Sequence, residues 1–364
     1  MAPCRLKAPT FGSVVKVPEF KFMNFADIEG HERPLAILRR ALANKTLAHA
    51  YLFSGEAGIG KKMTALALAA AVNCSAPGED GGCGECSSCK RIAALTHPDV
   101  QVVMPESENE RLLATWSSKA AEKASDEIKI DQIRQAQETL TLTPSEGSKK
   151  ILIVNGAETL NASAQNAFLK TLEEPPGDTL IVLVTSMPQS LLPTIRSRCQ
   201  EVSFLPLSRR ALTQALISRR GLAEEDARFL AALSQGSMGR ALAMDLEQEK
   251  TDREELMTLW AGLGQRGTGE VLALAEAFGK DRDRLERLLA IGVEWIRDTL
   301  VFRMTGDEKL LVYGRGADQY RGVQVPLQRM LADLELLTAS RDLLERRVSA
   351  QLVAENLLFQ LGRA

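Results

Sequence analysis

The sequence contains no run of about 18 or more apolar residues, so it predicts no membrane-spanning helix. Residues 1–23 carry scattered basic side chains but neither an apolar core nor a small-residue cleavage site. They indicate a loosely held leader and no secretory signal. We therefore expect a cytoplasmic protein that makes no use of a membrane.

A strong charge of either sign is also missing. The net charge is −2 and the pI is about 6.1, so no basic field surrounds the whole protein. Tight DNA binding by this chain alone is not expected, although a weak or shared DNA contact stays open. The length of 364 residues, with 45% hydrophobic and 25% charged residues, is typical of a soluble protein of two or three domains.

Apolar runs and helical patterns alternate in the first part of the chain. The runs at 48–53, 99–103, 150–154 and 179–185 are typical of buried strands, and helical segments separate them. This alternation predicts an α/β domain with a parallel sheet. After about residue 206 the strand signals vanish, and the remaining sequence predicts helices only.

A glycine-rich loop follows the first strand, in the segment Ser54–Lys62. Gly55, Gly58 and Gly60 permit the turn whose backbone N–H groups surround phosphates at a helix N-terminus, and Lys61 adds a positive charge. The next position supplies the hydroxyl ligand of Mg²⁺ in this motif, and here it is Lys62. Thr64 cannot replace that hydroxyl, because two residues turn a helix by roughly 200°.

The partner motif of such a loop is a pair of acidic residues at the end of a buried strand. The strand at 150–154 ends instead in Asn155 and Gly156, which offer no carboxylate. We set Glu158 aside as part of the following turn. Together with Lys62 these departures predict loss of ATP hydrolysis. Two alternatives remain: a turn that binds no ligand, and weak phosphate binding without Mg²⁺.

Four of the six cysteines lie within sixteen residues. Cys83, Cys86 and Cys89 form two CxxC steps, and Cys74 ends the preceding helix. Four sulfur ligands predict a closed structural Zn²⁺ site without a catalytic vacancy. Redox thiols or free cysteines in a glycine-rich loop are the alternatives.

The strand at 179–185 is followed by a segment that ends in Ser197, Arg198 and Cys199. An arginine at a subunit boundary can reach the γ-phosphate of ATP bound to a neighbour, and such a finger can raise the rate by about 10³–10⁵. Taken alone, however, Arg198 is better explained as a surface residue that forms an ion pair, as most arginines are.

These motifs occur in an order that resembles the bacterial clamp-loader subunits of the AAA+ class, most closely those of the delta-prime type. The resemblance rests on the segments 49–55 and 166–176, the incomplete phosphate loop, the cysteine module and the Ser197–Cys199 motif. It covers about residues 24–245, and the helical C-terminal third matches mainly in length and character.

The resemblance implies an AAA+ α/β domain at 24–205, a helical lid at 206–247 and a helical collar for oligomerisation at 248–364. The zinc module at 74–89 and a charged insertion at 106–127 would belong to the first domain. We expect that insertion to be a mobile loop or a partly helical arm. Arg240 lies one residue from the position of the family's lid arginine, and we assign it no role.

The resemblance also implies a function inside a complex with motor subunits of the gamma/tau type and a delta subunit, joined through the collar. There the chain would be a non-hydrolysing stator that offers Arg198 to a neighbour's ATP site. The complex would load the sliding clamp onto primer–template DNA at the replisome. The alternatives are an ATP-hydrolysing motor subunit, which Lys62, Asn155 and Gly156 disfavour, and a zinc-stabilised scaffold of another complex.

Overall fold

The computed structural model describes residues 24–108, 125–312, 320, 325–346 and 348–362. The chain divides into two compact units, Met1–Pro206 and Leu207–Ala364. Within the described residues, none of the helices combines the length and the apolar character needed to cross a membrane.

The first unit contains a five-stranded sheet in the order β2-β3-β4-β1-β5, and every neighbouring pair is parallel. The strands are β1 (Ala50–Ser54), β2 (Val100–Val103), β3 (Lys150–Asn155), β4 (Thr179–Thr185) and β5 (Gln200–Ser203). The parallel α/β fold expected from the sequence is confirmed.

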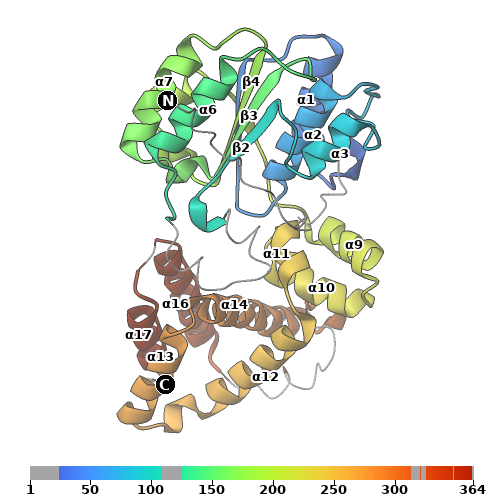
Figure 1. The fold of residues 1–364 in the computed structure, drawn as a ribbon. Coiled ribbons are helices and arrows are strands. Elements are labelled where there is room, and N and C mark those ends of the chain that lie inside the picture. The colour runs from blue at the N-terminus through green and yellow to red at the C-terminus, as the bar shows by residue number, and fades with distance from the viewer. Residues whose placement is uncertain (1–23, 109–124, 313–319, 321–324, 347, 363–364) are drawn as a thin grey trace, which may run out of the picture. The chain divides into compact units, whose positions relative to one another are not determined.

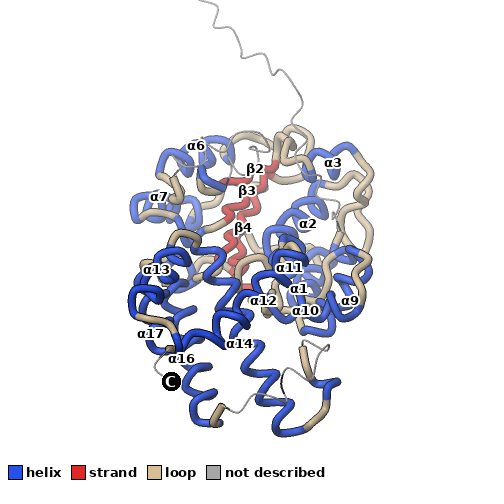
Figure 2. Tube along the Cα trace, turned by 90° about the horizontal axis from the view of Figure 1, so that it is seen from below, coloured by secondary structure: helices blue, strands red, loops and turns tan. Residues whose placement is uncertain are grey.

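Helices cover both faces of this sheet, as Figures 1 and 2 show. One face carries α1 (Glu32–Ala43), α2 (Lys61–Asn73) and α3 (Ser87–Ala93); the other carries α6 (Ile130–Leu140), α7 (Ala162–Glu173) and α8 (Pro193–Arg196). Side chains of β3 alternate between the two cores: Ile151 and Ile153 face one, and Leu152 and Val154 face the other. A strand buried on both faces needs the continuous apolar run that its sequence has.

Strand β5 and helix α3 are two of the elements of this unit that the sequence analysis does not predict. Strand β5 has a single buried residue, Val202, so it lacks the apolar run of the central strands; it pairs only with β1, at the edge of the sheet. Helix α3 starts at the end of the cysteine module, and Cys86 is its N-cap residue, whose sulfur accepts a hydrogen bond from the Cys89 N–H. The short 3₁₀ turns are Phe25–Asp27, Ala157–Thr159 and Pro188–Ser190.

The charged insertion expected at 106–127 lies mostly outside the described residues, but its two ends are placed. The Ser107 N–H donates to the Ser125 carbonyl at 3.2 Å, and the Ser125 N–H donates to the Glu106 carboxylate at 3.3 Å. The chain therefore leaves and re-enters the domain at one point, as an insertion requires.

The second unit is helical throughout its described residues, as expected. It consists of α9 (Arg209–Arg220), α10 (Glu224–Leu233), α11 (Met238–Ala243), α12 (Leu246–Gly262), α13 (Thr268–Gly279), α14 (Arg282–Thr305), α16 (Leu327–Glu345) and α17 (Ala350–Leu361), with 3₁₀ turns at Leu263–Gln265 and Glu308–Leu310. One apolar core gathers mainly residues of α9 to α11, and another joins α13, α14, α16 and α17. The division into lid and collar near residue 247 remains a prediction, and it falls in the first turn of α12.

Candidate functional site

The glycine-rich loop connects β1 to α2, as a phosphate-binding loop does. Gly55, Gly58 and Gly60 all have positive φ angles, of 141°, 75° and 110°. At Gly55 a Cβ atom would lie 2.4 Å from the carbonyl oxygen of Phe204, so the backbone path admits only glycine there.

Lys61 is buried at the start of α2, and its Nζ donates to the carbonyl oxygens of Gly55 and Glu56, both at 2.5 Å. Burial lowers the pKa of Lys61 to about 8, although the nearby Glu158 and Glu56 carboxylates oppose that shift. The lysine is thus satisfied by the loop's own backbone. A phosphate that entered would have to compete with these two carbonyls.

Lys62 and Asn155 occupy the two positions that bind Mg²⁺ in a working site, and here both contact Glu108. Lys62 Nζ lies 3.2 Å from Glu108 Oε1, and Asn155 Nδ2 donates to both oxygens of Glu108 at 2.8 and 2.9 Å. Thr64 is fully buried, and its hydroxyl donates to the Gly60 carbonyl at 3.0 Å, inside the helix. Among these residues, only Glu108 carries a negative charge.

Glu158 lies in the 3₁₀ turn after β3, as expected, and it also acts electrostatically on Lys61 of the glycine-rich loop. Its carboxylate accepts hydrogen bonds from the Ser186 hydroxyl at 2.5 Å and from the Ser186 N–H at 3.2 Å. It therefore joins β3 to the segment after β4 and contributes negative potential at Lys61. Turn residues carry no periodicity, so this contact could not be predicted from the sequence pattern.

His31 is a second residue that the sequence pattern did not single out. Its Nε2 lies 2.6 Å from the carbonyl oxygen of Ile59, in the phosphate loop, and its ring meets the Phe204 ring edge-on at 5.1 Å. An N–H donor must face that carbonyl, so Nε2 carries the proton. The ring holds the loop against the body of the domain.

The pH dependence of stability tests this role of His31. Burial lowers its pKa from the ordinary value of 6.5, against the opposing effect of the Ile59 carbonyl. Below about pH 6.5 the unfolded chain consequently binds a proton more readily than the folded chain does. The contribution of His31 is complete above that pH and is lost as the pH falls, by up to about 1.4 kcal/mol per pH unit.

We expect the free energy of unfolding in urea to fall less between pH 7.5 and 5.5 in His31→Gln than in the unmodified chain. Glutamine keeps an N–H donor and does not titrate. Comparing the two pH values within each protein cancels any constant cost of the substitution at the left-handed φ of 56°. Equal pH dependence in both proteins would contradict the assignment.

The four clustered cysteines come together at the C-terminal end of α2. Their Sγ atoms all lie within 4.8 Å of one another, and those of Cys74 and Cys86 are 3.8 Å apart. A tetrahedral Zn²⁺ ion with Zn–S bonds of about 2.3 Å needs sulfurs about 3.8 Å apart. The donor set therefore fits a structural zinc ion with a closed coordination shell.

Backbone N–H groups support negative charge on these sulfurs. Cys74 Sγ accepts from the Ala76 and Cys83 N–H groups at 3.4 and 3.3 Å, and Cys83 Sγ accepts from the Cys86 N–H at 3.3 Å. Hydrogen bonds to the thiolate form lower a thiol pKa, and the pKa of Cys83 is lowered chiefly in this way. Metal binding requires the thiolate form.

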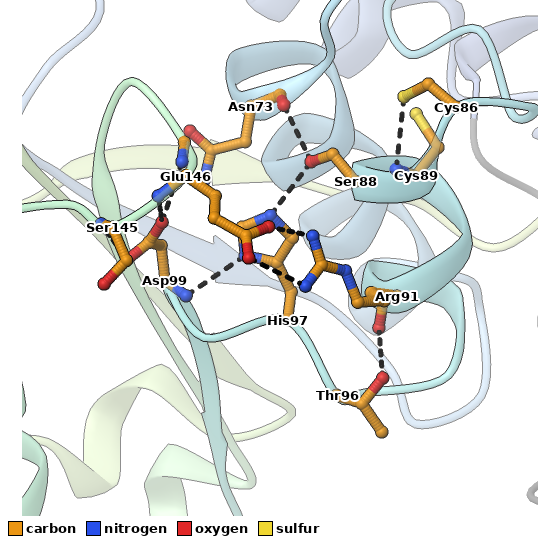
Figure 3. A network of polar contacts seen from close by, with 11 residues as sticks. Asn73, Cys86, Ser88, Cys89, Arg91, Thr96, His97, Asp99, Ser145 and Glu146 are labelled. Atoms are coloured by element: carbon orange, nitrogen blue, oxygen red, sulfur yellow. Dashed lines mark hydrogen bonds and ion pairs between the residues drawn. The ribbon is translucent and has the colours of Figure 1, made fainter.

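A polar network, drawn in Figure 3, joins the cysteine module to the edge of the sheet. His97 accepts at Nδ1 from the Asp99 N–H at 3.1 Å, so its Nε2 donates to the Ser88 hydroxyl at 3.0 Å; that hydroxyl in turn donates to the Asn73 carbonyl at 2.7 Å. Ser88 lies between two of the cysteines. The module is thus fastened to the domain by more than its sulfurs.

Asp99 closes the same network on the side of β3. Its carboxylate accepts three backbone N–H bonds from residues 145–147 at 2.7–2.8 Å and pairs with Lys150 Nζ at 2.8 Å. Burial alone would raise the pKa of Asp99, but Lys150 and the N–H groups hold it below its usual range. Arg91 of α3 also pairs with Glu146. The loop before β3 and the cysteine module therefore form one connected structure.

The Ser197–Cys199 motif follows α8 directly. Arg198 is half-buried; its Nη2 lies 2.6 Å from Glu173 Oε1, and its Nη1 donates to the Thr194 carbonyl at 2.9 Å. Glu173 ends α7, so the segment 166–176 and the Ser197–Cys199 motif meet at this ion pair. Burial raises the pKa of Cys199 to about 12, which makes its thiol a packing group. The Ser197 hydroxyl donates to the Thr194 carbonyl.

The structure thus gathers the predicted residues into three separate places in the first unit. The phosphate loop and the cysteine module occupy opposite ends of α2, and Arg198 lies after α8. Arg240 is exposed in the first turn of α11, in the second unit.

Comparison with known proteins shows the family to which the chain belongs. Residues 30–208 match the model of the family described as DNA polymerase III, delta subunit. DNA polymerase III subunit delta' of Pseudomonas aeruginosa is 33% identical over 317 residues, which cover 86% of this chain and 91% of the relative. Subunit delta' of Bacillus subtilis is 32% identical, covering 77% and 80%, respectively.

A relative with a different subunit name is also similar, but over a smaller part of both chains. DNA polymerase III subunit tau of Bacillus subtilis is 32% identical over 234 residues, which cover 62% of this chain and 38% of the relative. The delta' relatives, by contrast, match over most of both chains. On these matches, the chain belongs to the family of DNA polymerase III subunit delta', with an AAA+ α/β domain at its N-terminal side.

Proposed function

We propose that this chain is the non-hydrolysing subunit of a clamp loader, a cytoplasmic complex of DNA polymerase III that places the sliding clamp on primed DNA. Its contribution to ATP chemistry is Arg198, offered to the ATP site of a neighbouring gamma/tau-type subunit. The proposal rests on one observation: Glu108 binds both Lys62 and Asn155. These two residues occupy the positions that a hydrolysing subunit needs for Mg²⁺.

The surroundings of Arg198 support the finger role. Glu173 and the Thr194 carbonyl each hold one guanidinium nitrogen, so the side chain has a defined direction while about a third of it is exposed. A guanidinium always carries its charge and donates through five N–H groups, so donors remain for a phosphate. At a neighbour's γ-phosphate it would stabilise the negative charge that develops during hydrolysis.

Exposed apolar side chains support oligomerisation through the C-terminal helices. Leu327 and Leu331 lie one turn apart on α16 and are 48% and 44% exposed, and Leu352 on α17 is 61% exposed. Apolar residues of this size favour burial in an interface. We assign this collar surface to the motor and delta subunits, with the clamp and primer–template DNA bound by the assembled complex.

The purified chain should hydrolyse no ATP above the background without enzyme, because it lacks a carboxylate at 155 and a hydroxyl at 62. The measurement is phosphate release at saturating MgATP, alongside the Lys61→Ala variant. We expect the two proteins to be indistinguishable. Turnover by the unmodified chain that Lys61→Ala abolishes would refute the stator role and favour the motor alternative.

A further inference from the structure

The nucleotide site of this chain contains an anion of its own, the carboxylate of Glu108. Three separate elements meet there: Lys62 belongs to α2, Asn155 ends β3, and Glu108 follows β2. Its oxygens lie 2.8 and 2.9 Å from Asn155 Nδ2, and one of them lies 3.2 Å from Lys62 Nζ. These contacts join positions 46 and 47 residues apart in the sequence.

The carboxylate of Glu108 lies between the two positions that hold Mg²⁺ in related ATP sites. In a phosphate-loop ATPase, the residue after the loop lysine and the acid at the end of the partner strand hold Mg²⁺ between them. Both positions are altered here, and the side chains that replace them converge on the same carboxylate, Asn155 on both oxygens and Lys62 on Oε1. Glu108 therefore lies where the metal and the phosphate oxygens that it binds would be.

The charges at this point also balance without a ligand. The ammonium of Lys62 offsets the carboxylate of Glu108, and the neutral amide of Asn155 donates to it. The Lys62 side chain is mostly buried and that of Glu108 is partly exposed, at 18% and 37%. Lys61 is likewise satisfied, through the Gly55 and Glu56 carbonyls.

We infer that Glu108 is an internal stand-in for the nucleotide's phosphate, which keeps this chain's own nucleotide site closed. The inference rests on the proposed function, since it explains how the stator keeps its site out of the ATP cycle. Removing the charge of Glu108 should leave the ammonium of Lys62 unpaired next to Lys61. The opened site would then take a nucleoside triphosphate without a divalent metal, because an ammonium replaces the metal and Asn155 has no charge to bind one.

The test is equilibrium binding of a fluorescent ATP analogue to the full chain, with EDTA and with Mg²⁺. We expect Glu108→Gln to bind at least tenfold more tightly than the unmodified chain, and equally well with and without Mg²⁺. The matched control is Glu106→Gln, two residues earlier, whose carboxylate pairs with Lys129 at 3.3 Å and is not part of this cluster. It should bind no better than the unmodified chain.

A second variant shows which group receives the nucleotide. Adding Lys62→Met to Glu108→Gln should remove the gain, while circular dichroism confirms that all variants are folded. Unchanged binding in Glu108→Gln, or a gain that requires Mg²⁺, would overturn the inference and leave the stator role intact. A different result would refute the stator role, namely ATP turnover by the unmodified chain.

Discussion

Replacing Arg198 with alanine should slow ATP hydrolysis at the neighbouring subunit's site by about 10³-fold, the lower end of the range for fingers supplied in trans. The complex should still assemble, because Arg198 lies after α8 in the first unit and the collar helices belong to the second. The loss comes from the transition state, where the guanidinium meets charge that the bound substrate does not yet carry.

A single-turnover measurement isolates the affected site. Complexes are reconstituted with motor subunits, loaded with radiolabelled ATP, and mixed with clamp and primed DNA. The unmodified complex should hydrolyse all its bound ATP in one phase, whereas Arg198→Ala should leave a slow fraction that corresponds to one interface. Arg196→Ala is the matched control, since Arg196 is exposed in the same short segment.

A substitution at Glu173 tests the same role with a smaller expected effect. Glu173→Gln removes the charge that holds Arg198 at 2.6 Å but leaves the guanidinium in place, so its effect on the slow fraction should be much smaller. If Arg198→Ala hydrolyses its bound ATP like the Arg196→Ala control, the finger role is wrong. If the complex with Arg198→Ala does not assemble, Arg198 has a structural role instead.

The features that could be predicted from the sequence are those formed by residues close together along the chain. The phosphate loop needs glycines and a lysine at fixed spacing, and the cysteine module needs short steps, so both could be predicted from local pattern. The central strands could be predicted as well, because burial on both faces demands continuous apolar residues. The edge strand β5 could not, since it buries only Val202.

Contacts between segments that are distant in the sequence could not be predicted from it. Glu108 looked like one of many charges in a polar stretch, and Glu158 like a turn residue. Their roles follow from the sheet order, in which β3 lies between β2 and β4 and brings the segments after all three strands to one edge. Only that topology shows that the substitutions at 62 and 155 share a partner.

We expect the cysteine module to hold a zinc ion, and removal of that ion to cause the largest stability change in this protein. Cys86 is the N-cap residue of α3, whose Cys89 and Ile92 are fully buried in the core that also contains α1 and α2. Without the ion, four sulfurs within 4.8 Å of one another lose the charge that holds them together. An ion present at about 1,000 times its dissociation constant stabilises the folded state by about 4 kcal/mol.

We therefore expect Cys86→Ser to lose most of its zinc and about 4 kcal/mol of the free energy of unfolding. Zinc per chain is measured on untagged protein by elemental analysis, and stability by urea titration with and without a chelator. Cys199→Ser is the matched control, because Cys199 is packed in the other core, away from the cluster. It should keep its zinc and its sensitivity to chelation. If Cys86→Ser and Cys199→Ser contain equal zinc, the module is no metal site, and the polar network around His97 and Asp99 alone must hold α3 in place.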